Sequence, residues 1–179
     1  MAFQNFQKQQ DDGFDHRMVD LRRVTRVVKG GRRFRFRATV IVGDKRGQVG
    51  MGVAKGADVQ AAISKAQDAA KKNVIRFILE GGTIPHEITR TYRGATVFLK
   101  PAPQGSGIIA GGPIRSVALL GGLRDLSSKM MGSHNRLNVV RATMMALEAM
   151  QERKEKPAKK VSEATVVKEN ETKGENHAS

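Results

Sequence analysis

Residues 22–42 constrain the fold of this chain more than any other stretch of its sequence. Apolar residues alternate with other types over its second half. The apolar positions are Phe34, Phe36, Ala38, Val40 and Val42, and the others are Arg33, Arg35, Arg37, Thr39 and Ile41. Successive side chains of a strand point to opposite faces, so the pattern predicts a strand with one apolar face. We expect the apolar face to pack in a core and the arginine face to bind an anion.

Short turns on both sides of this strand predict a three-stranded antiparallel meander. The first turn contains Lys29, Gly30, Gly31 and Arg32, and it follows an expected strand over residues 19–28. The second turn lies at residues 44–47, and beyond it Val49, Met51 and Val53 alternate with Gln48, Gly50 and Gly52. Consecutive strands joined by short turns pair antiparallel. Glycines within the third strand predict that another backbone approaches it closely, or that it lies at an edge.

A long helix is expected to follow the third strand and to cover the sheet. Asp58 can cap its first turn, because a carboxylate accepts hydrogen bonds from free backbone amides. Apolar residues then recur at intervals of three and four: Val59, Ile63, Ala66, Ala70, Val74 and Phe77. This spacing predicts one apolar helix face up to the break at Gly81 and Gly82. Residues 17–81 are therefore interpreted as one domain with three strands and a long helix.

Residues 82–150 are interpreted as a second domain with the order β-β-α-β-α. Two strands are expected over residues 84–93 and 95–100, then a short helix over residues 113–120, since Pro113 suits a first helical turn. Residues 123–131 form a strand or an irregular segment. Asn135 caps a last helix with the apolar stripe Leu137, Val140, Met144 and Leu147. The fold class is α+β with two small domains, a mobile arm over residues 1–16 and a disordered charged tail over residues 151–179.

The net charge of the chain predicts a polyanionic binding partner. The 179 residues include 32 Lys and Arg against 17 Asp and Glu, a formal net charge of +15. Residues 17–55 hold twelve of these basic residues, with only Asp20 and Asp44 as acids. Such a balance favours nucleic acid ahead of an anionic membrane. No apolar run approaches the ~20 residues that cross a bilayer, so we expect no membrane partner and a protein of the cytoplasm or of an organelle's interior.

No enzyme, cofactor or metal site is expected. Without cysteine there is no thiolate ligand or nucleophile, and the four histidines are scattered without ligand spacing. Gly105-x-Gly107-x-x-Ala110, with Asp125 eighteen residues beyond Gly107, superficially fits a dinucleotide motif. Two prolines separate these glycines from the strand before them, and the domain has too few strands for a doubly wound sheet. The glycines are better interpreted as a loop that another backbone, protein or RNA, approaches closely.

Arginine-rich strands around a glycine turn indicate contact with a nucleic-acid backbone. Arginine offers phosphate a planar fork, and glycine lets a backbone come near. Few aromatic residues accompany the arginines, so phosphate contacts and recognition of RNA shape fit better than base stacking. The candidate RNA-binding residues are Arg22, Arg23, Arg26, Lys29, Gly30, Gly31, Arg32, Arg33, Arg35, Arg37, Lys45, Arg46, Lys55, Arg115 and Arg141.

Four motifs in the same order make the chain similar to one known family. They are Lys29-Gly30-Gly31-Arg32, Val42-Gly43-Asp44, Gly105-Ser106-Gly107-Ile108-Ile109-Ala110-Gly111-Gly112 and Asn138-Val139-Val140-Arg141-Ala142-Thr143. Over residues 17–150 the chain closely resembles ribosomal protein five of the small subunit, bacterial type. It departs from the family pattern at Arg136, where members often carry proline, and in its long charged tail.

The resemblance implies an N-terminal domain like a double-stranded-RNA-binding domain and a C-terminal domain with a left-handed βαβ crossover. It also implies a structural constituent of the small ribosomal subunit that binds rRNA and supports subunit assembly and head–body arrangement. A further implied role is in translational accuracy, on the side of the subunit where mRNA enters. The alternative is a free double-stranded-RNA-binding module that acts outside the ribosome.

The resemblance also implies particular neighbours. These are the small-subunit rRNA, small-subunit proteins four and eight, and mRNA; no homo-oligomer is expected. The turn at residues 29–32 would lie near the place where spectinomycin binds. The implied interface with protein four, where changes alter decoding accuracy, consists of Gly105, Ser106, Gly107, Gly111 and Gly112.

Overall fold

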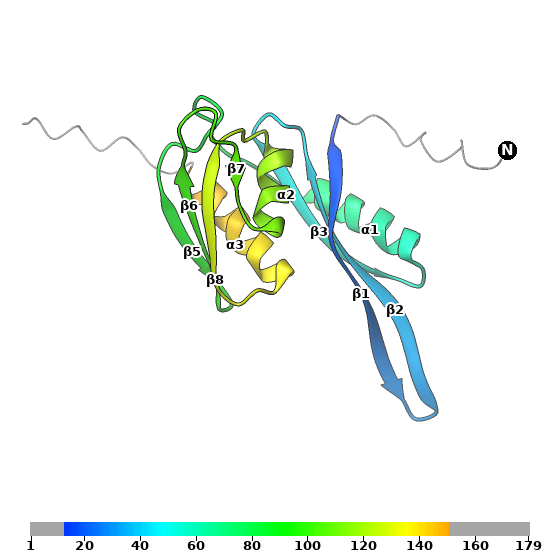
Figure 1. The fold of residues 1–179 in the computed structure, drawn as a ribbon. Helices are drawn as coiled ribbons and strands as arrows, with labels where there is room; N and C mark the ends of the chain where they lie inside the picture. The colour runs from blue at the N-terminus through cyan, green and yellow to red at the C-terminus, as the bar shows by residue number, and fades with distance from the viewer. Residues whose placement is uncertain (1–12, 151–179) are drawn as a thin grey trace, which may run out of the picture.

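The computed structural model describes residues 13–150, which form two sheets and three helices (Figure 1). The first unit contains β1 (Asp15–Val28), β2 (Gly31–Gly43), β3 (Gln48–Gly56), α1 (Val59–Lys72) and β4 (Val74–Arg76). The second contains β5 (Ile88–Tyr92), β6 (Ala95–Pro101), β7 (Ile108–Ile109), α2 (Gly112–Gly121), β8 (Leu126–Gly132) and α3 (Arg136–Ala149). The expected tail over residues 151–179 and most of the expected N-terminal arm lie outside the described residues.

The first sheet is antiparallel with the order β1-β2-β3-β4, which confirms the predicted meander and adds a strand to it. The predicted helix to Gly81 is wrong, because α1 ends at Lys72 and Asn73 donates its backbone N–H to the carbonyl of Ala70. Val74 then pairs with Gly50, so the chain joins the free edge of β3. A β-branched pair beside an open edge favours a strand over a further helical turn.

The two boundary residues of this unit also differ from expectation. β1 begins at Asp15, so the arm expected over residues 1–16 reaches two residues too far. Asp58 does occupy the N-cap position of α1, but its side chain makes no capping hydrogen bond. Its backbone carbonyl instead accepts from the N–H of Ala62 at 3.0 Å. The first turn of α1 is therefore held by the backbone alone in this structure.

Glycines of β3 let α1 lie directly against the sheet. A Cβ atom on Gly52 would overlap the carbonyl oxygen of Ala66, and one on Gly50 would overlap that of Ala70. The predicted close approach is confirmed, and β3 is not an edge strand. The buried residues of α1 are the alanines Ala62, Ala66 and Ala70. The wider stripe predicted through Val59 and Ile63 is only half-buried, because so close a contact admits nothing larger than a methyl group.

The opposite face of the first sheet is covered by the second unit. Ile41, Val49 and Met51 belong to one buried cluster with residues such as Val117 and Leu120 of α2. The backbone of the turn after β2 also docks there, since the N–H of Lys45 donates to the carbonyl of Leu120 at 2.9 Å. Both faces of β2 are therefore buried at this end. The expectation that its second face is polar is wrong for Thr39 and Ile41, which are fully buried.

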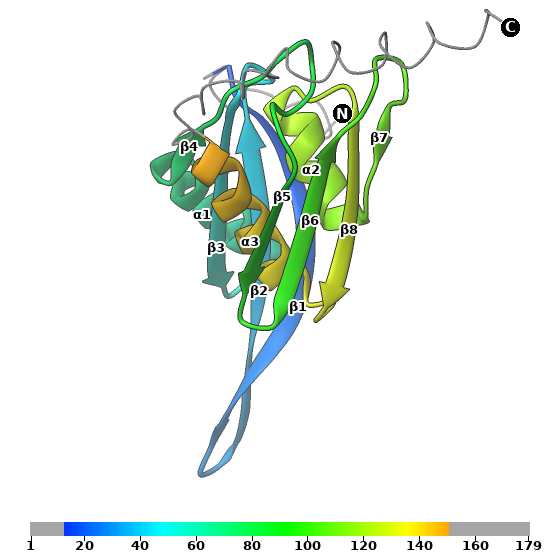
Figure 2. The same cartoon turned by 90° about the vertical axis from the view of Figure 1, so that its left-hand side faces the viewer.

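The second sheet has the order β5-β6-β8-β7, with α2 and α3 on one of its faces (Figure 2). β7 and β8 pair in parallel with α2 between them, a β-α-β crossover unit. The side chain of Asn135 accepts a hydrogen bond from the N–H of Leu137 at 3.3 Å, which confirms the predicted cap of α3. Val140 and Leu147 are buried as expected, whereas Leu137 and Met144 are half-buried. No helix within residues 13–150 has the length and apolar character to cross a membrane.

Candidate nucleic-acid interface

The paired strands β1 and β2 continue well beyond the core that covers their base. Figure 1 shows their far end projecting from the body of the molecule. We call residues 24–35 the outer hairpin, and residues 15–21 with 38–43 the hairpin base. No residue of the outer hairpin is buried, whereas residues 38–43 are all buried. At the tip, a Cβ atom on Gly30 would meet no atom within 4 Å, so the turn is open to an approaching molecule.

The register of the strands gathers basic side chains on one face. Directly paired residues share a face in an antiparallel sheet. Arg26 pairs with Arg33, Val24 with Arg35, and Arg22 with Arg37, which in turn pairs with Lys55 of β3. We call the set Arg22, Arg26, Arg33, Arg35, Arg37 and Lys55 the basic face. The prediction that Arg33, Arg35 and Arg37 lie together is confirmed, and β1 and β3 contribute three more cations to them.

The other face of the outer hairpin is mixed in character. Phe34 was expected in the core, but it is 48% exposed, because the core under α1 begins only at Phe36 and Ala38. The guanidinium of Arg23 lies 4.4 Å from the centre of the Phe34 ring. Such cation–π contact adds about 0.5–1 kcal/mol at an exposed site. Arg23 and Arg32 therefore lie on the face opposite the basic face.

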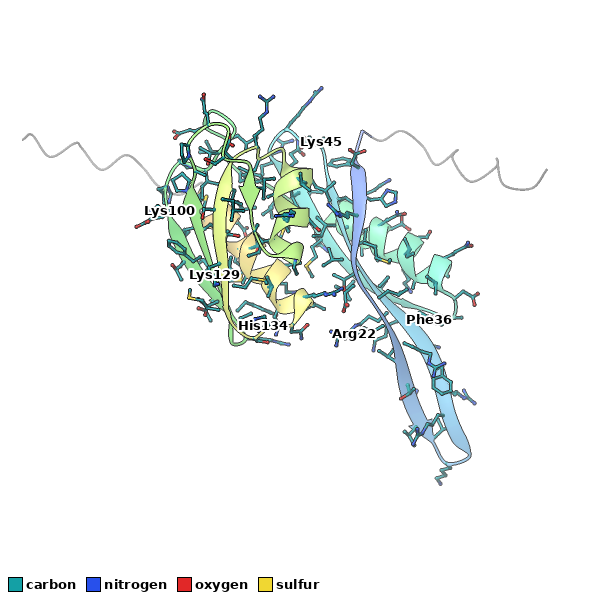
Figure 3. The ribbon with its side chains drawn as sticks, in the orientation of Figure 1. Arg22, Phe36, Lys45, Lys100, Lys129 and His134 are labelled. Carbon is teal, nitrogen blue, oxygen red and sulfur yellow. The ribbon has the colours of Figure 1, made fainter. Side chains whose placement is uncertain are left out.

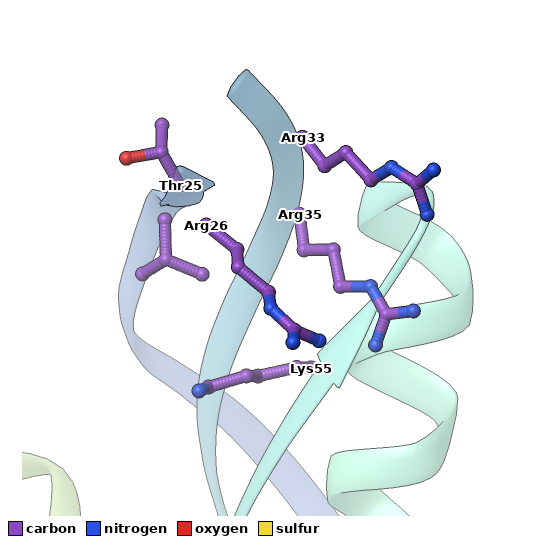
Figure 4. A pocket seen from close by; sticks show the side chains of 6 residues that line it. Thr25, Arg26, Arg33, Arg35 and Lys55 are labelled. Atoms are coloured by element: carbon purple, nitrogen blue, oxygen red, sulfur yellow. The ribbon is translucent and has the colours of Figure 1, made fainter. Parts of the chain in front are cut away.

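Four members of the basic face surround an open pocket of about 230 Å³ (Figure 4). Arg26, Arg33, Arg35 and Lys55 line it together with Val24 and Thr25. Within residues 13–150, no carboxylate lies within ion-pair distance of any of the four cations. Like charges that share a pocket without a counter-charge repel one another, and this repulsion is relieved when an anion enters. The pocket therefore has the charge expected of a candidate anion site.

The remaining two cations of the basic face, Arg22 and Arg37, have different surroundings from the outer four. The Nε of Arg22 lies 2.9 Å from a carboxylate oxygen of Asp20, whose side chain is only 8% exposed. Arg136 of α3 approaches the other oxygen at 3.7 Å and donates to the carbonyl of Val19 at 3.0 Å. Arg37 is half-buried, with its Nε buried and unpaired. Arg22 therefore anchors the hairpin base, and the outer four cations are the ones open to a ligand.

Sequence reasoning did not find this junction between the two units. Asp20 lies at an irregularity of β1, where the pairing register shifts between Met18 and Asp20. It is also the one acidic residue between His16 and Gly43. A lone acid within so basic a strand is a usable signal, because a buried carboxylate requires a nearby cation. Arg136, which stands out in the sequence only as a departure from a family pattern, is a cation that the second unit places near the carboxylate of Asp20.

Two of the remaining candidates, Lys45 and Arg46, lie away from the basic face. Figure 3 shows Lys45 at the end of the sheet opposite the outer hairpin. Its ammonium contacts the carboxylate of Asp15, and this hydrogen bond and attraction hold the pKa of Asp15 below its usual range. The carboxylate of Asp44 closes the same turn by accepting from the backbone N–H groups of Arg46 and Gln48 at 2.7 and 3.0 Å. These cations belong to a different surface.

Arg115 and Arg141 are exposed residues of the second unit, and the structure does not bring them to the outer hairpin. Arg115 donates to the carbonyl of Ile108 at 3.1 Å. Arg141 donates to the hydroxyl of Tyr92 at 2.9 Å and lies over its ring. Both side chains thus stabilise contacts within their own unit. Of the fifteen candidates, the structure gathers on one face only Arg22, Arg26, Arg33, Arg35, Arg37 and Lys55.

The glycine segment before α2 is held in one conformation by Asp125. The N–H of Gly107 donates to Oδ1 of Asp125 at 2.8 Å, and its carbonyl accepts from the N–H of Leu126 at 3.1 Å. Gly105 and Gly107 have positive φ angles of 87° and 69°, which favour glycine. Gly105, Ser106 and Gly112 are exposed, so the segment presents a fixed loop to solvent. Asp125, considered only as part of a nucleotide motif, is buried as the anchor of this loop.

Metal binding finds no support in the described part of the chain. Among residues 13–150, no three His, Asp or Glu side chains gather as a metal site would need.

Comparison with protein families places both units in one family. The N-terminal domain of ribosomal protein S5 matches residues 14–77, and the C-terminal domain of ribosomal protein S5 matches residues 90–160. Together the two matches cover about three quarters of the chain. They correspond to the two units of the structure, the first ending after β4 and the second beginning within β5.

Proposed function

Since the chain belongs to the ribosomal protein S5 family, we infer that the basic face of its outer hairpin is an rRNA-binding surface. Members of this family are structural components of the small ribosomal subunit in the cytoplasm, not enzymes, and they bind its rRNA. The family leaves open which side chains touch the RNA. The observation that supports our assignment is a set of four cations without an ion pair among residues 13–150: Arg26, Arg33 and Arg35 on a hairpin that projects from the core, and Lys55 on the neighbouring β3.

The chemistry of this face favours the RNA backbone over the bases. Its cations can each contact phosphate, and arginine does so through two parallel hydrogen bonds. The basic face carries no aromatic side chain. Stacking of single-stranded bases needs aromatic platforms, so we propose recognition of structured RNA through phosphate and shape.

Salt dependence of RNA affinity tests the proposal. Each phosphate contact releases counterions and contributes about 0.7–0.9 to the slope of log affinity against log salt. Changing Arg26, Arg33 and Arg35 together to Gln should therefore lower the slope by about 2–3. The control changes Arg90, Lys100 and Lys129 to Gln; Figure 3 shows Lys100 and Lys129 on the second sheet, far from the hairpin. An equal fall in slope for both variants would contradict the assignment.

Choice of RNA separates a ribosomal component from a general duplex binder. We expect the full chain to prefer a structured fragment of small-subunit rRNA over an arbitrary duplex of equal length. Competition between the two at one salt concentration measures that preference. Equal affinity would instead support a free double-stranded-RNA-binding module.

We also propose that the glycine segment contacts small-subunit protein four and influences decoding accuracy, as the family resemblance suggests. The support from the structure is that Gly105 and Ser106 are exposed on a loop held by Asp125 through Gly107, that Gly112 is exposed at the start of α2, and that Ile109 of β7 between them is 61% exposed. The side chain of Ile109 is thus available for an apolar contact with a partner protein.

A substitution at Ile109 tests this interface without altering a glycine. Ile109→Asp should raise misreading by ribosomes that carry the variant, because a charge opposes an apolar contact. Met145→Asp on α3 is the control, since Met145 is also exposed, at 45%. Unchanged misreading with Ile109→Asp, in subunits that contain the variant, would overturn the proposal.

Further family roles are proposed on the resemblance alone. They are contact with small-subunit protein eight, support of head–body arrangement, a position where mRNA enters, and a hairpin tip near the spectinomycin site. Crosslinking from Lys29 at the tip, within intact subunits, tests the last of these. Crosslinks confined to rRNA remote from that site would contradict it.

A further inference from the structure

The pocket on the basic face joins the outer hairpin to the body of the first sheet. Arg26 comes from β1, Arg33 and Arg35 come from β2, and Lys55 comes from β3 (Figure 4). Lys55 lies on β3, the strand against which α1 packs, and its own side chain is exposed. Arg26 and Arg33 belong to the part of the hairpin without a core. A ligand that contacts all four cations therefore bridges these two regions.

The size and lining of the pocket suit a single phosphate group. Its volume of about 230 Å³ is below the ~300–1,000 Å³ of sites that enclose a whole small molecule. Apart from the cations, the lining consists of Val24 and Thr25. Few groups are available to read a base or a sugar there. The tetrahedral oxygens of a phosphate can accept from several guanidinium and ammonium groups at once.

We propose that this pocket seats one phosphate group of the RNA backbone and that its occupancy fastens the outer hairpin to the core. The proposal rests on the proposed function and goes beyond it, because it names one site and one structural consequence. Without an anion, the four like charges around the pocket repel one another, and this repulsion opposes the close pairing of Arg26 with Arg33. With a phosphate in place, each cation gains a shared counter-charge, and the hairpin becomes more rigid.

Inorganic phosphate is the probe that isolates this site from the rest of the RNA. The full chain is titrated with phosphate against chloride at constant ionic strength, so that general screening is the same in both series. Hydrogen exchange of the backbone amides of residues 24–35 reports the rigidity of the outer hairpin. We expect saturable slowing of exchange with phosphate and none with chloride.

Single substitutions locate the effect. Lys55→Gln and Arg35→Gln should each weaken phosphate binding about tenfold, as expected for the loss of a hydrogen bond between charged groups. The matched control is Arg23→Gln, which removes a cation from the opposite face of the same hairpin and should change binding less than about twofold. If Arg23→Gln and Lys55→Gln lowered phosphate affinity equally, the effect would come from net charge alone, and the proposed phosphate site would be wrong.

Parallel titrations with rRNA keep the two proposals distinguishable. One outcome is that phosphate fails to slow hydrogen exchange while the change of Arg26, Arg33 and Arg35 to Gln still lowers the salt slope of rRNA binding. In that case the proposed phosphate site is wrong and the proposed rRNA-binding surface is retained. If Lys55→Gln weakens phosphate binding but leaves rRNA affinity unchanged, the seat is not used by RNA and the proposal fails. Loss of both supports it.

Discussion

The two ends of one hairpin differ in almost everything except their backbone pairing. At the base, Val40 and Ile41 of β2 are fully buried on opposite faces, one toward α1 and the other toward the second unit. At the outer end of the same strand, Arg33, Phe34 and Arg35 are exposed on both faces. The pairing of β1 with β2 runs through both ends, with one register shift between Met18 and Asp20. Burial of apolar area stabilises the base, whereas the outer end is held by pairing with β1 alone.

This difference explains where the charge lies. The cations Arg26, Arg33 and Arg35 would be costly inside a core, because a buried charge without a counter-charge is strongly unfavourable. On a projecting hairpin they remain hydrated and are free to bind an external anion. At the base, by contrast, Asp20 is paired with Arg22 and approached by Arg136. We infer that the base carries stability and the outer hairpin carries RNA affinity.

Glycine substitutions at the two ends should give the largest contrast. Gly52→Ala places a methyl group on the carbonyl of Ala66, so α1 must move away from the sheet. We expect a loss of about 4 kcal/mol or more in the free energy of unfolding. Gly30→Ala at the tip meets no atom within 4 Å and should change stability by less than about 0.5 kcal/mol. Chemical denaturation measures both, and similar losses would break the comparison.

Apolar truncations at the two ends should differ next most. Ile41→Ala leaves a cavity between the two units and should lower the free energy of unfolding by about 3 kcal/mol. Val27→Ala, at a residue that is 74% exposed on the outer hairpin, should cost less than about 0.5 kcal/mol. Thermal unfolding of both variants checks this. A loss at Val27 comparable to that at Ile41 would mean that the outer hairpin has a core of its own.

Comparison of the sequence with the structure shows which parts of this contrast are predictable from the sequence. Most of the strands, the turn at Lys29 and Gly30 and the cap at Asn135 follow from local sequence patterns, although the turn was predicted to extend to Arg32 and β2 begins at Gly31. β4 does not follow from local patterns, because Val74 and Phe77 continue the helical spacing of α1, and residues 74–76 become a strand only beside the free edge of β3. The alanine stripe of α1 depends on glycines more than ten residues away.

Burial on the second face of β2 could not be read from the alternation of residues. The pattern separates Ile41 from Val40 correctly, but only the second unit makes the face of Ile41 a core. Phe34 likewise continues the apolar pattern of β2, but it lies beyond the part of the strand that α1 covers and is therefore exposed. The site itself was more predictable, since register follows from the turn and places Arg33 and Arg35 together. The basic face does not include four other predicted cations, which lie elsewhere in the structure: Lys45, Arg46, Arg115 and Arg141.

Loss of the cation at the junction should have a moderate effect. Arg136→Gln removes the hydrogen bond to Val19 and the approach to Asp20, and should lower the free energy of unfolding by about 1 kcal/mol. Hydrogen exchange should increase at the β1 residues near Val19. Arg93→Gln, an exposed cation of the second unit, is the control. If both variants behave alike, Arg136 does not link the two units.

The ion pair at the start of β1 should give the smallest effect and a defined pH dependence. The folded-state pKa of Asp15 is lowered by Lys45, so the pair stabilises the fold above the ordinary value of 3.8. That contribution is lost as the pH falls below 3.8 through the lowered value. Lys45→Gln should therefore lower Tm slightly at neutral pH, and this difference should shrink as the pH falls from 3.8 through the lowered pKa, while Arg46→Gln has no such dependence. A difference that does not shrink below pH 3.8 would contradict this origin.

The most direct test of the central claim measures stability and RNA affinity on one variant. The change of Arg26, Arg33 and Arg35 to Gln removes mutually repelling charges that make no internal ion pair among the described residues. We predict that Tm is unchanged or higher, while the salt slope of rRNA binding falls by about 2–3. A lower Tm together with an unchanged slope would show that these arginines serve the fold and not the RNA.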